Sequence, residues 1–419
     1  MSIVAATSGP VDEALRARAS TALPKGIYGH VAADLLWQGA PQFVSRAEGS
    51  RFWDVDGNEY VDLMCSWGPI LLGHRHPAVE EAVERQHGLV DCGNGPSPVM
   101  VDLAERLVEV VDHAAWTLFA KNGGDATTLC LMVARAHTGR GTILMAEGAY
   151  HGSLPWCCPG EAGVVPGDRA HIAYYRYNDL ESVAAAAQHH SGDLAGIIVS
   201  PFRHDAGFDQ EMPDAEFARG LRELCDRTGA LLILDDVRCG FRLAFGSSWE
   251  PLGITPDLSA WSKGIANGYA ISAVLGADAL RGAAASLSAT GSFWFAADSM
   301  AAALATIDVL ERERGVEAMS RTGRLLWEGI ERQAGERGVE INLTGHMTMP
   351  YLTFPGDRSH RLSEVFAGVC AREGVFVHPR HNWFISTALT EADAAAAVAA
   401  MGHGFDAVAE VRDAARLDG

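Results

Sequence analysis

The sequence predicts an α/β protein with a mostly parallel sheet sandwiched between helices, and a smaller α+β domain beside it. Short apolar runs of strand length recur along the middle of the chain, at 142–146, 195–200 and 230–235. Between the last two runs, residues 214–229 place Phe217, Leu221 and Leu224 at helical spacing. Strand, helix and strand in that order favour parallel strands that are covered on both faces.

The chain divides into three segments. Residues 1–64 form an N-terminal segment that contributes to the small domain, and residues 52–63 within it predict a hairpin with an Asp-Gly turn. Residues 65–315, where apolar runs alternate with helical patterns, form the large domain. Residues 316–419 form the C-terminal small domain. Its patterns are a long helix, two strand-like pieces and an Ala-rich helix, at 316–337, 348–354, 374–378 and from 391 onward.

The balance of charges argues against polyanionic partners. The chain carries 33 basic and 53 acidic residues, for a net charge of −20, which repels nucleic acid and anionic membranes. It has no apolar stretch of about 18 residues and no basic start followed by an apolar run, so we expect no membrane span and a cytoplasmic location. Its eight cysteines are scattered without paired spacing, which predicts neither a disulfide framework nor a metal site.

Lysine chemistry has few possible positions, because the chain contains only three lysines. Lys25 lies in a turn, where an exposed lysine is expected. Lys121 precedes a pair of glycines that lacks the Walker spacing. Lys263 lies among small residues, in AWSKGIANGY, and such a segment lets the backbone approach a flat ligand closely.

Two acidic residues, Asp235 and Asp236, end the apolar run that begins at 230. The carboxyl ends of parallel strands are where ligands bind. A carboxylate there can keep a pyridine nitrogen protonated, because a nearby negative charge favours the charged form. A protonated pyridine ring in turn stabilises a carbanion. The alternative is that the two residues cap the strand toward solvent.

Two further segments have the composition of a cofactor site. Gly123 and Gly124 open a predicted helix, where free backbone N–H groups and the helix dipole attract an anion. Asp125 would repel a phosphate, and its alternative role is to cap the helix. After the run at 142–146, Tyr150 can lie flat on an aromatic cofactor, where stacking contributes about 0.5–1.5 kcal/mol beyond burial. A core tyrosine is the alternative.

Taken together, these segments resemble the class III aminotransferases, and most closely the glutamate-1-semialdehyde aminomutase branch of the pyridoxal-5′-phosphate (PLP) fold type I. The resemblance spans about Pro24 to Ala400 and rests on five motifs in the family's order. They are SWGP at 66–69, NGGDAT at 122–127, YHG at 150–152, DDVRCGFR at 235–242 and SKGIANG at 262–268.

The resemblance implies a seven-stranded sheet in the large domain and PLP as the cofactor. It implies that Lys263 holds PLP as an imine and then moves the substrate's proton. Asp235 would pair with the ring nitrogen, while Tyr150 would stack on the ring. Further cofactor contacts are implied for Gly123, Gly124, Asp125, His151 and Val237.

The resemblance also implies a homodimer with the active site at the subunit interface. In this family a threonine of the neighbouring subunit completes the phosphate site. Ser292, in TGSFW, takes that position here, and its hydroxyl suits the same purpose. Closed two-fold pairing is also the commonest form of oligomer.

Departures from the family pattern concern the substrate. Ala32 stands where the aminomutases have the arginine that binds the substrate carboxylate, which argues against the aminomutase reaction itself. Near the C-terminus, Arg380 is suited to clamp a carboxylate in bidentate fashion, and its alternative is a solvated loop residue. The predicted substrate residues are His30, Ser66, Trp67, Arg203 and Arg380, with His204 also at the rim of the pocket.

Two reactions stay open. The first is transamination, in which an amino group moves from an amino donor to a keto or aldehyde acceptor through the Lys263 imine and pyridoxamine phosphate. The second is an intramolecular amine shift or an epimerisation, which needs no external keto acceptor. A nicotinamide-dependent dehydrogenase would require Gly-x-Gly-x-x-Gly after an early strand, and the sequence has none. A non-catalytic PLP-fold protein would not need the electron sink that Asp235 supports.

Overall fold

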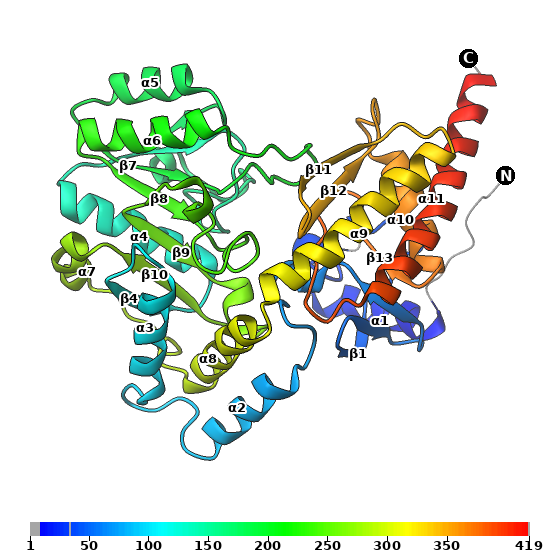
Figure 1. Cartoon of the computed structure of the whole chain (residues 1–419), viewed down its shortest axis with the longest axis horizontal. Helices are drawn as coiled ribbons and strands as arrows, with labels where there is room; N and C mark the ends of the chain where they lie inside the picture. The colour runs from blue at the N-terminus through cyan, green and yellow to red at the C-terminus, as the bar shows by residue number, and fades with distance from the viewer. Residues whose placement is uncertain (1–8, 33–34, 418–419) are drawn as a thin grey trace.

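A seven-stranded sheet forms the centre of the larger part of the molecule in the computed structural model, which describes residues 9–32 and 35–417 (Figure 1). The strand order is β4-β10-β9-β8-β7-β5-β6. β10 runs antiparallel to both of its neighbours, whereas the other paired strands are parallel. The strands are β4 (Trp116–Ala120), β5 (Thr142–Ala146), β6 (Ile172–Tyr175), β7 (Leu194–Val199), β8 (Leu231–Asp235), β9 (Leu258–Trp261) and β10 (Ser272–Gly276). The predicted fold class is confirmed.

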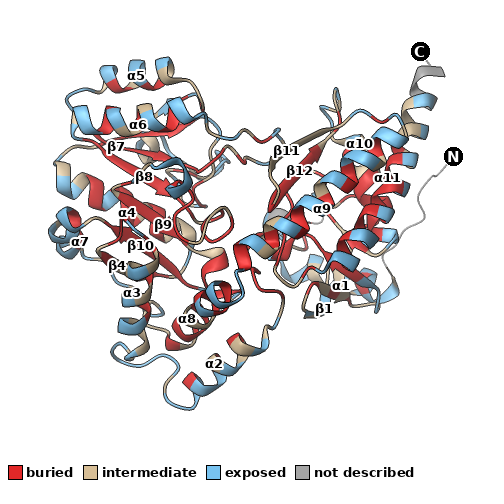
Figure 2. Cartoon of the chain, in the orientation of Figure 1, coloured by how far each residue is buried: buried red, intermediate tan, exposed pale blue. Residues whose placement is uncertain are grey.

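Helices cover both faces of this sheet (Figures 1 and 2). One face carries α4 (Gly123–Thr138) and α7 (Arg281–Ser286). The other face carries α3 (Val99–Val110), α5 (Leu180–His189), α6 (Ala215–Thr228) and α8 (Ala297–Arg312). The buried sheet therefore has two apolar layers, one against each set of helices.

Strand β8 shows how sequence pattern sets these layers. All five of its residues are buried, and successive side chains of a strand point to opposite faces. Leu232 and Leu234 lie in the layer of α6, whose Phe217 and Leu221 are buried there as predicted. Ile233 lies in the opposite layer, that of α4. Asp235, the last residue of this buried strand, therefore lies at the edge of the protein interior.

A second, four-stranded sheet joins the two ends of the chain in the order β1-β2-β3-β13. β13 runs parallel to β3, with Val375 opposite Val61. β2 and β3 form the predicted hairpin, and Gly57 takes a φ of +90° in its turn. These strands are β1 (Val44–Glu48), β2 (Arg51–Asp54), β3 (Glu59–Asp62) and β13 (Val375–Phe376). The domain boundaries at 64/65 and 315/316 stay a prediction.

Helices and a hairpin complete the smaller part of the molecule. The hairpin pairs β11 (Asn342–His346) with β12 (Met349–Thr353). The helices are α1 (Pro10–Ala22), α9 (Gly315–Glu336), α10 (Arg361–Arg372) and α11 (Glu391–Leu417). Helix α2 (Pro77–His87) packs instead on α8. The predicted long helix at 316–337 corresponds to α9, and the Ala-rich helix to α11.

The fully buried Arg242 holds segments from both parts of the chain together. Its Nη1 donates to the Ile385 carbonyl at 2.8 Å, and its Nη2 donates to the carbonyls of Gly68 at 2.9 Å and Ile70 at 3.0 Å. Burial lowers the pKa of its guanidinium to about 10. Its guanidinium also lies 5.0 Å from the centre of the Phe384 ring. Arg242 therefore fixes the loop after β8 against two segments that are distant in sequence.

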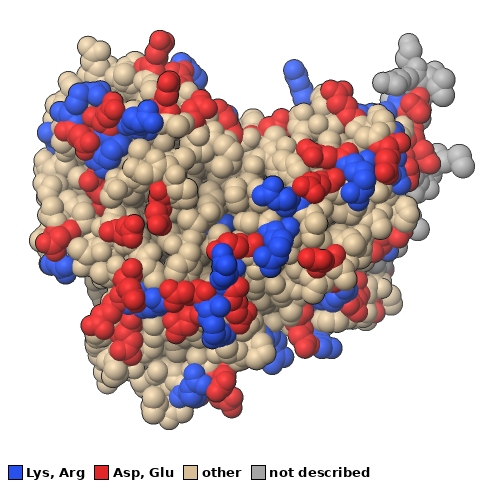
Figure 3. Space-filling view, in the orientation of Figure 1, with Lys and Arg blue, Asp and Glu red and all other residues tan. Residues whose placement is uncertain are grey.

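The surface carries both signs of charge, interspersed over the face in Figure 3. Within residues 9–32 and 35–417, no helix is long and apolar enough to cross a membrane.

Candidate active site

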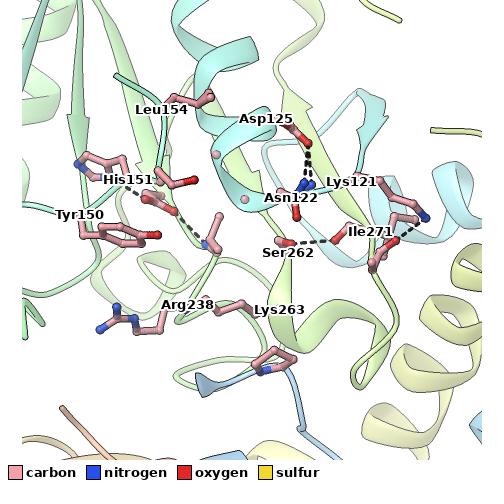
Figure 4. Close-up of a pocket in the computed structure, with 18 of the residues that line it drawn as sticks. Lys121, Asn122, Asp125, Tyr150, His151, Leu154, Arg238, Ser262, Lys263 and Ile271 are labelled. Carbon is pink, nitrogen blue, oxygen red and sulfur yellow. Dashed lines mark hydrogen bonds and ion pairs between the residues drawn. The ribbon is translucent and has the colours of Figure 1, made fainter. Parts of the chain in front are cut away.

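A cavity of about 560 Å³ opens at the carboxyl ends of the central strands (Figure 4). Four strands, β4, β5, β8 and β9, each lead into a segment that lines it. This is the edge of an open parallel sheet where ligands bind. The cavity brings together most of the predicted cofactor residues, namely Gly123, Gly124, Asp125, Tyr150, His151, Asp235, Val237 and Lys263.

Lys263 begins a short 3₁₀ turn directly after β9. Its backbone takes a φ of +46°, which is unusual for a residue with a side chain. Burial and, to a smaller extent, the positive charge of Arg238 lower the pKa of its amine to about 7, while Asp235 acts in the opposite direction. Near neutral pH a substantial fraction of the amine is therefore unprotonated, and an unprotonated amine is a nucleophile.

Asp235 is the last residue of β8, and its side chain is held from two sides. Its Oδ2 lies 2.6 Å from Nδ1 of His151, and its Oδ1 accepts the Val237 N–H at 3.1 Å. Asp235 is 5% exposed, so its charge acts in a medium of low dielectric constant. The other ring nitrogen of His151 is buried without a hydrogen-bond partner among the described residues.

The neighbouring Asp236 has a different environment. It accepts from the Ser247 hydroxyl at 3.1 Å and from the Ser248 N–H at 3.2 Å, and it does not line the cavity. Burial raises the pKa of its carboxyl to about 7. Asp235 therefore lies on the cavity, whereas Asp236 packs within the protein. Neither residue caps the strand toward solvent.

The N-terminus of α4 forms a narrow cradle at the cavity. The amides of Gly123 and Gly124 have no acceptor among the described residues. A Cβ on Gly123 would lie 2.6 Å from Cγ1 of Val237, so glycine is needed for the close approach. Asp125 turns its carboxylate back to accept the Asn122 N–H at 2.8 Å. The free amides and the helix dipole suit an anion.

Arg238 is a site residue that sequence reasoning missed. It lines the cavity and is 8% exposed. Its Nη1 donates to the His204 carbonyl at 2.7 Å and to Oδ1 of Asn382 at 3.1 Å. The signal was present in the motif DDVRCGFR, where Arg238 lies two residues beyond Asp236. A loop residue gives no periodic pattern from which its direction can be predicted.

Comparison with known proteins identifies the family. The model of the class III aminotransferases matches residues 37–390. An aminopentol aminotransferase of Sphingopyxis macrogoltabida is 47% identical over 98% of this chain and 97% of its own. A glutamate-1-semialdehyde 2,1-aminomutase of Desulfatibacillum aliphaticivorans is 33% identical over 90% of this chain and 95% of its own. The chain belongs to the class III aminotransferases.

A solved structure agrees with this membership. The FumI protein of Sphingopyxis sp. MTA144, in its PLP internal aldimine form, superposes with a TM-score of 0.95. It is 47% identical, and the match covers 97% of this chain and 98% of that one. The present aminotransferase is therefore a PLP-dependent enzyme that acts on small-molecule amines.

The cavity of this aminotransferase fits PLP on its own evidence. The unpaired amides at the start of α4 suit a phosphate. The buried Asp235 suits a protonated ring nitrogen, and the Lys263 amine suits a covalent bond to an aldehyde. Tyr150 borders the same cavity, and burial raises the pKa of its phenol. The phenol therefore stays protonated at neutral pH.

Other predicted residues of the aminotransferase lie outside this cavity. Ser66 and Trp67 line a second, apolar cavity of about 280 Å³, where the Trp67 ring lies 5.0 Å from that of His378. Ser292 is exposed and does not line the main cavity of its own chain. The side chain of His30 lies outside the described residues. Ala32, which replaces the aminomutase arginine, is buried.

The two arginines predicted to bind substrate do not line the main cavity either. Arg203 pairs with Asp205 at 3.5 Å and with Glu211 at 3.8 Å. Arg380 forms an ion pair with Glu364. Both guanidinium groups therefore have carboxylate partners within the chain, and their roles toward substrate stay predictions. His204, placed at the rim, does line the cavity.

Proposed function

We propose that this enzyme transfers an amino group from a small-molecule amine to a keto or aldehyde acceptor, with Lys263 as the covalent anchor of PLP and the carrier of the proton. The supporting observation is the Lys263 amine, whose pKa is lowered to about 7, on the same cavity as the buried Asp235. PLP, when bound, supplies an electron sink beside the reacting carbon.

Each residue of the cavity has a proposed task in this reaction. The Lys263 amine would hold the aldehyde carbon of PLP and be displaced by the substrate amine, and it would then carry the proton from the substrate carbon to that former aldehyde carbon of the cofactor. Asp235, oriented by His151, holds a proton on the ring nitrogen. The amides of Gly123 and Gly124 bind the phosphate. Tyr150 and Val237 border the ring, and Asp125 supports the cradle through Asn122.

The relatives favour transfer over an internal shift. The relative at 47% identity is named an aminotransferase, whereas the aminomutase is 33% identical. Ala32, where the resemblance places the carboxylate-binding arginine of the aminomutases, supports the same choice. We therefore propose that the amine donor does not need a carboxylate, in keeping with the name aminopentol aminotransferase of the relative.

The dimer and the cellular location belong to the same proposal. Ser292 is exposed beside Phe293, an aromatic side chain that is 66% exposed. Aromatic side chains are enriched at protein interfaces. We propose that a second copy covers this surface and receives Ser292 at its phosphate site. We further propose a cytoplasmic location.

The test of the reaction is a half-reaction. An amine is added to the PLP-loaded enzyme without an acceptor, and the loss of the visible PLP absorbance and the formed carbonyl product are measured. Transamination predicts one product per active site until pyruvate is added, after which turnover continues. An isomerase would turn over without pyruvate, which would contradict transfer.

Lys263→Met tests the proposed anchor in the same assay. We expect the variant to lose the absorbance of covalently held PLP, and its turnover to fall by about 100- to 10,000-fold, the range for removal of a general acid–base catalyst. Lys121→Met is the matched control, because Lys121 is the other lysine on the cavity wall. Covalent PLP in the Lys263 variant, or its absence in the Lys121 variant, would overturn the assignment.

A further inference from the structure

Arg238 is a buried cation in the wall of the active-site cavity, and no described carboxylate lies within ion-pair distance of it. Its two hydrogen-bond acceptors, the His204 carbonyl and the Asn382 side-chain oxygen, are both neutral. Asp205 and Asp235 act on it electrostatically without forming an ion pair, and Asp205 lies 3.5 Å from Arg203. A buried charge that no direct ion pair compensates is costly to the fold. An anion that binds here would remove that cost.

The remaining donors of Arg238 face the cavity. Nη1 uses its hydrogens on His204 and Asn382. Nη2 and Nε have no acceptor among the described residues, and neither atom is among the fully buried atoms that lack a partner. Since Arg238 lines the cavity, these N–H groups are accessible from within it. The planar fork of a guanidinium binds a carboxylate through two parallel hydrogen bonds.

Its position matches a group next to the reacting amine. Arg238 lies near Lys263 and below Tyr150 in Figure 4. It acts electrostatically on both of these residues. The ring of His204 lies on the same wall, buried at 4% exposure, and neither of its nitrogens has a hydrogen-bond partner among the described residues. The wall thus offers the Arg238 cation beside the reactive lysine, whereas both ring nitrogens of His204 are fully buried.

The other cations near the cavity are already engaged. Lys121 donates to the Ala270 carbonyl at 2.6 Å and to the Ser299 hydroxyl at 3.2 Å. Arg203 and Arg380 pair with carboxylates and do not line the cavity. Of the described residues that line it, Arg238 is therefore the cation best suited to a charged substrate group.

We propose that Arg238 is the specificity residue that binds the carboxylate of the 2-oxo acid acceptor and of its α-amino acid product. The proposal rests on the transamination proposed above. The amine donor needs no carboxylate, whereas the acceptor carries one, and Arg238 distinguishes the two. A neutral donor occupies the same space without using the guanidinium.

The experiment compares two amines in the half-reaction of the PLP-loaded enzyme. L-Alanine and isopropylamine differ only in that a methyl group replaces the carboxylate. In Arg238→Met we expect the half-saturating concentration of L-alanine to rise by about 10- to 100-fold, the range for loss of a hydrogen-bonded charge. The value for isopropylamine should change by less than about threefold. Any change in the maximal rate should be similar for the two amines, because the charge of Arg238 acts on the Lys263 amine in both reactions. Arg238→Lys, which keeps the charge and loses the fork, should fall between wild type and Arg238→Met.

A second measurement does not depend on catalysis. Propionate carries the carboxylate and has no amine, and its binding to the PLP-loaded enzyme is followed by the shift of the visible absorbance or by competition with L-alanine. We expect wild type to bind propionate and Arg238→Met to bind it at least about tenfold more weakly. Equal binding by both proteins would overturn the proposal.

Three controls separate the possible causes. Arg281→Met removes an exposed arginine that pairs with Asp278 and should leave the ratio of the two amines unchanged. If Arg203→Met or Arg380→Met shows the selective loss of L-alanine instead, Arg238 is not the carboxylate site. If Arg238→Met loses PLP or weakens both amines equally, the residue serves the cofactor and the proposal is wrong. A wild-type enzyme that reacts with neither amine contradicts the proposed transamination, and propionate binding then still tests Arg238.

Discussion

To bond to an aldehyde, the Lys263 amine has to lie in the cavity beside Asp235 and also has to be unprotonated. These requirements agree, because burial disfavours the ammonium form and lowers the pKa of the amine to about 7. Arg238 acts in the same direction, whereas Asp235 opposes it. The segment of small residues around Lys263 was apparent from the sequence, but the burial of its amine and the direction of the Arg238 side chain depend on the fold.

The lowered pKa predicts how the attachment of PLP depends on pH. The unprotonated fraction of the amine rises as the pH rises through about 7, so the rate of covalent attachment to the apoenzyme should rise over the same interval and level off above it. The rate is measured by the visible absorbance from about pH 6 to about pH 9, against Nα-acetyl-lysine, whose pKa is about 10.4. A profile that follows the free lysine would contradict the buried amine.

The adjacent acids Asp235 and Asp236 allow a matched comparison. Asp235→Asn removes the charge at the cavity and keeps the shape, so turnover should fall by about 100- to 1,000-fold, as for loss of one buried electrostatic contact to the reacting system. Asp236→Asn changes a group that contacts Ser247 and Ser248, and its turnover should stay within about threefold of wild type. The two variants are compared by their initial rates at saturating concentrations of an amine and pyruvate. Equal effects of both variants would count against the role of Asp235.

At the scale of elements, the site depends on where β8 ends and where α4 begins. The apolar runs predicted β5, β7 and β8 to within a residue at each end, because a strand buried on both faces has an uninterrupted apolar sequence. β9 and β10 gave no comparable signal, since their apolar residues are interrupted by small or polar ones such as Ser259 and Ser272. β13 has two residues and is defined by its pairing with β3 alone.

The start of α4 predicts a steric effect on cofactor binding. In Gly123→Ala the new Cβ would meet Val237 at 2.6 Å, and the loop has to shift. We expect the dissociation constant of PLP to rise by about 10- to 100-fold, the range for overpacking a tight site. Equilibrium dialysis of the variant measures it. Gly282→Ala, in the open space around α7, is the control and should bind PLP as wild type does.

At the scale of the whole molecule, the fold brings together the predicted cofactor residues except Ser292. Gly123, Gly124, Tyr150, Asp235 and Lys263 meet in one cavity, as the motifs predicted. Ser292 lies on the surface of its own chain. Sequence motifs indicate which residues belong to a site, whereas the separation of Ser66 and Trp67 into another cavity depends on packing between distant segments.

Complementation between subunits tests the proposed dimer. A mixed dimer of Lys263→Met with Ser292→Ala has one site that carries both defects. Its other site combines an intact Lys263 with an intact Ser292 from the neighbouring subunit, so it should bind PLP with wild-type affinity and give half of the wild-type turnover per dimer. Differently tagged subunits allow the mixed dimer to be isolated before PLP is titrated. If Ser292 acts within its own chain, no mixed dimer restores wild-type affinity at a working site.

The pairing of β13 with β3 has a consequence for how the chain folds during synthesis. Strand β3 emerges from the ribosome early, but its parallel partner is made near the opposite end of the chain. The sheet that contains both cannot close until the segments in between have been translated, and contacts of such high sequence separation form slowly. The early hairpin of β2 and β3 therefore remains an open edge throughout translation. A nascent chain that stalls before Val375 leaves this edge free to aggregate.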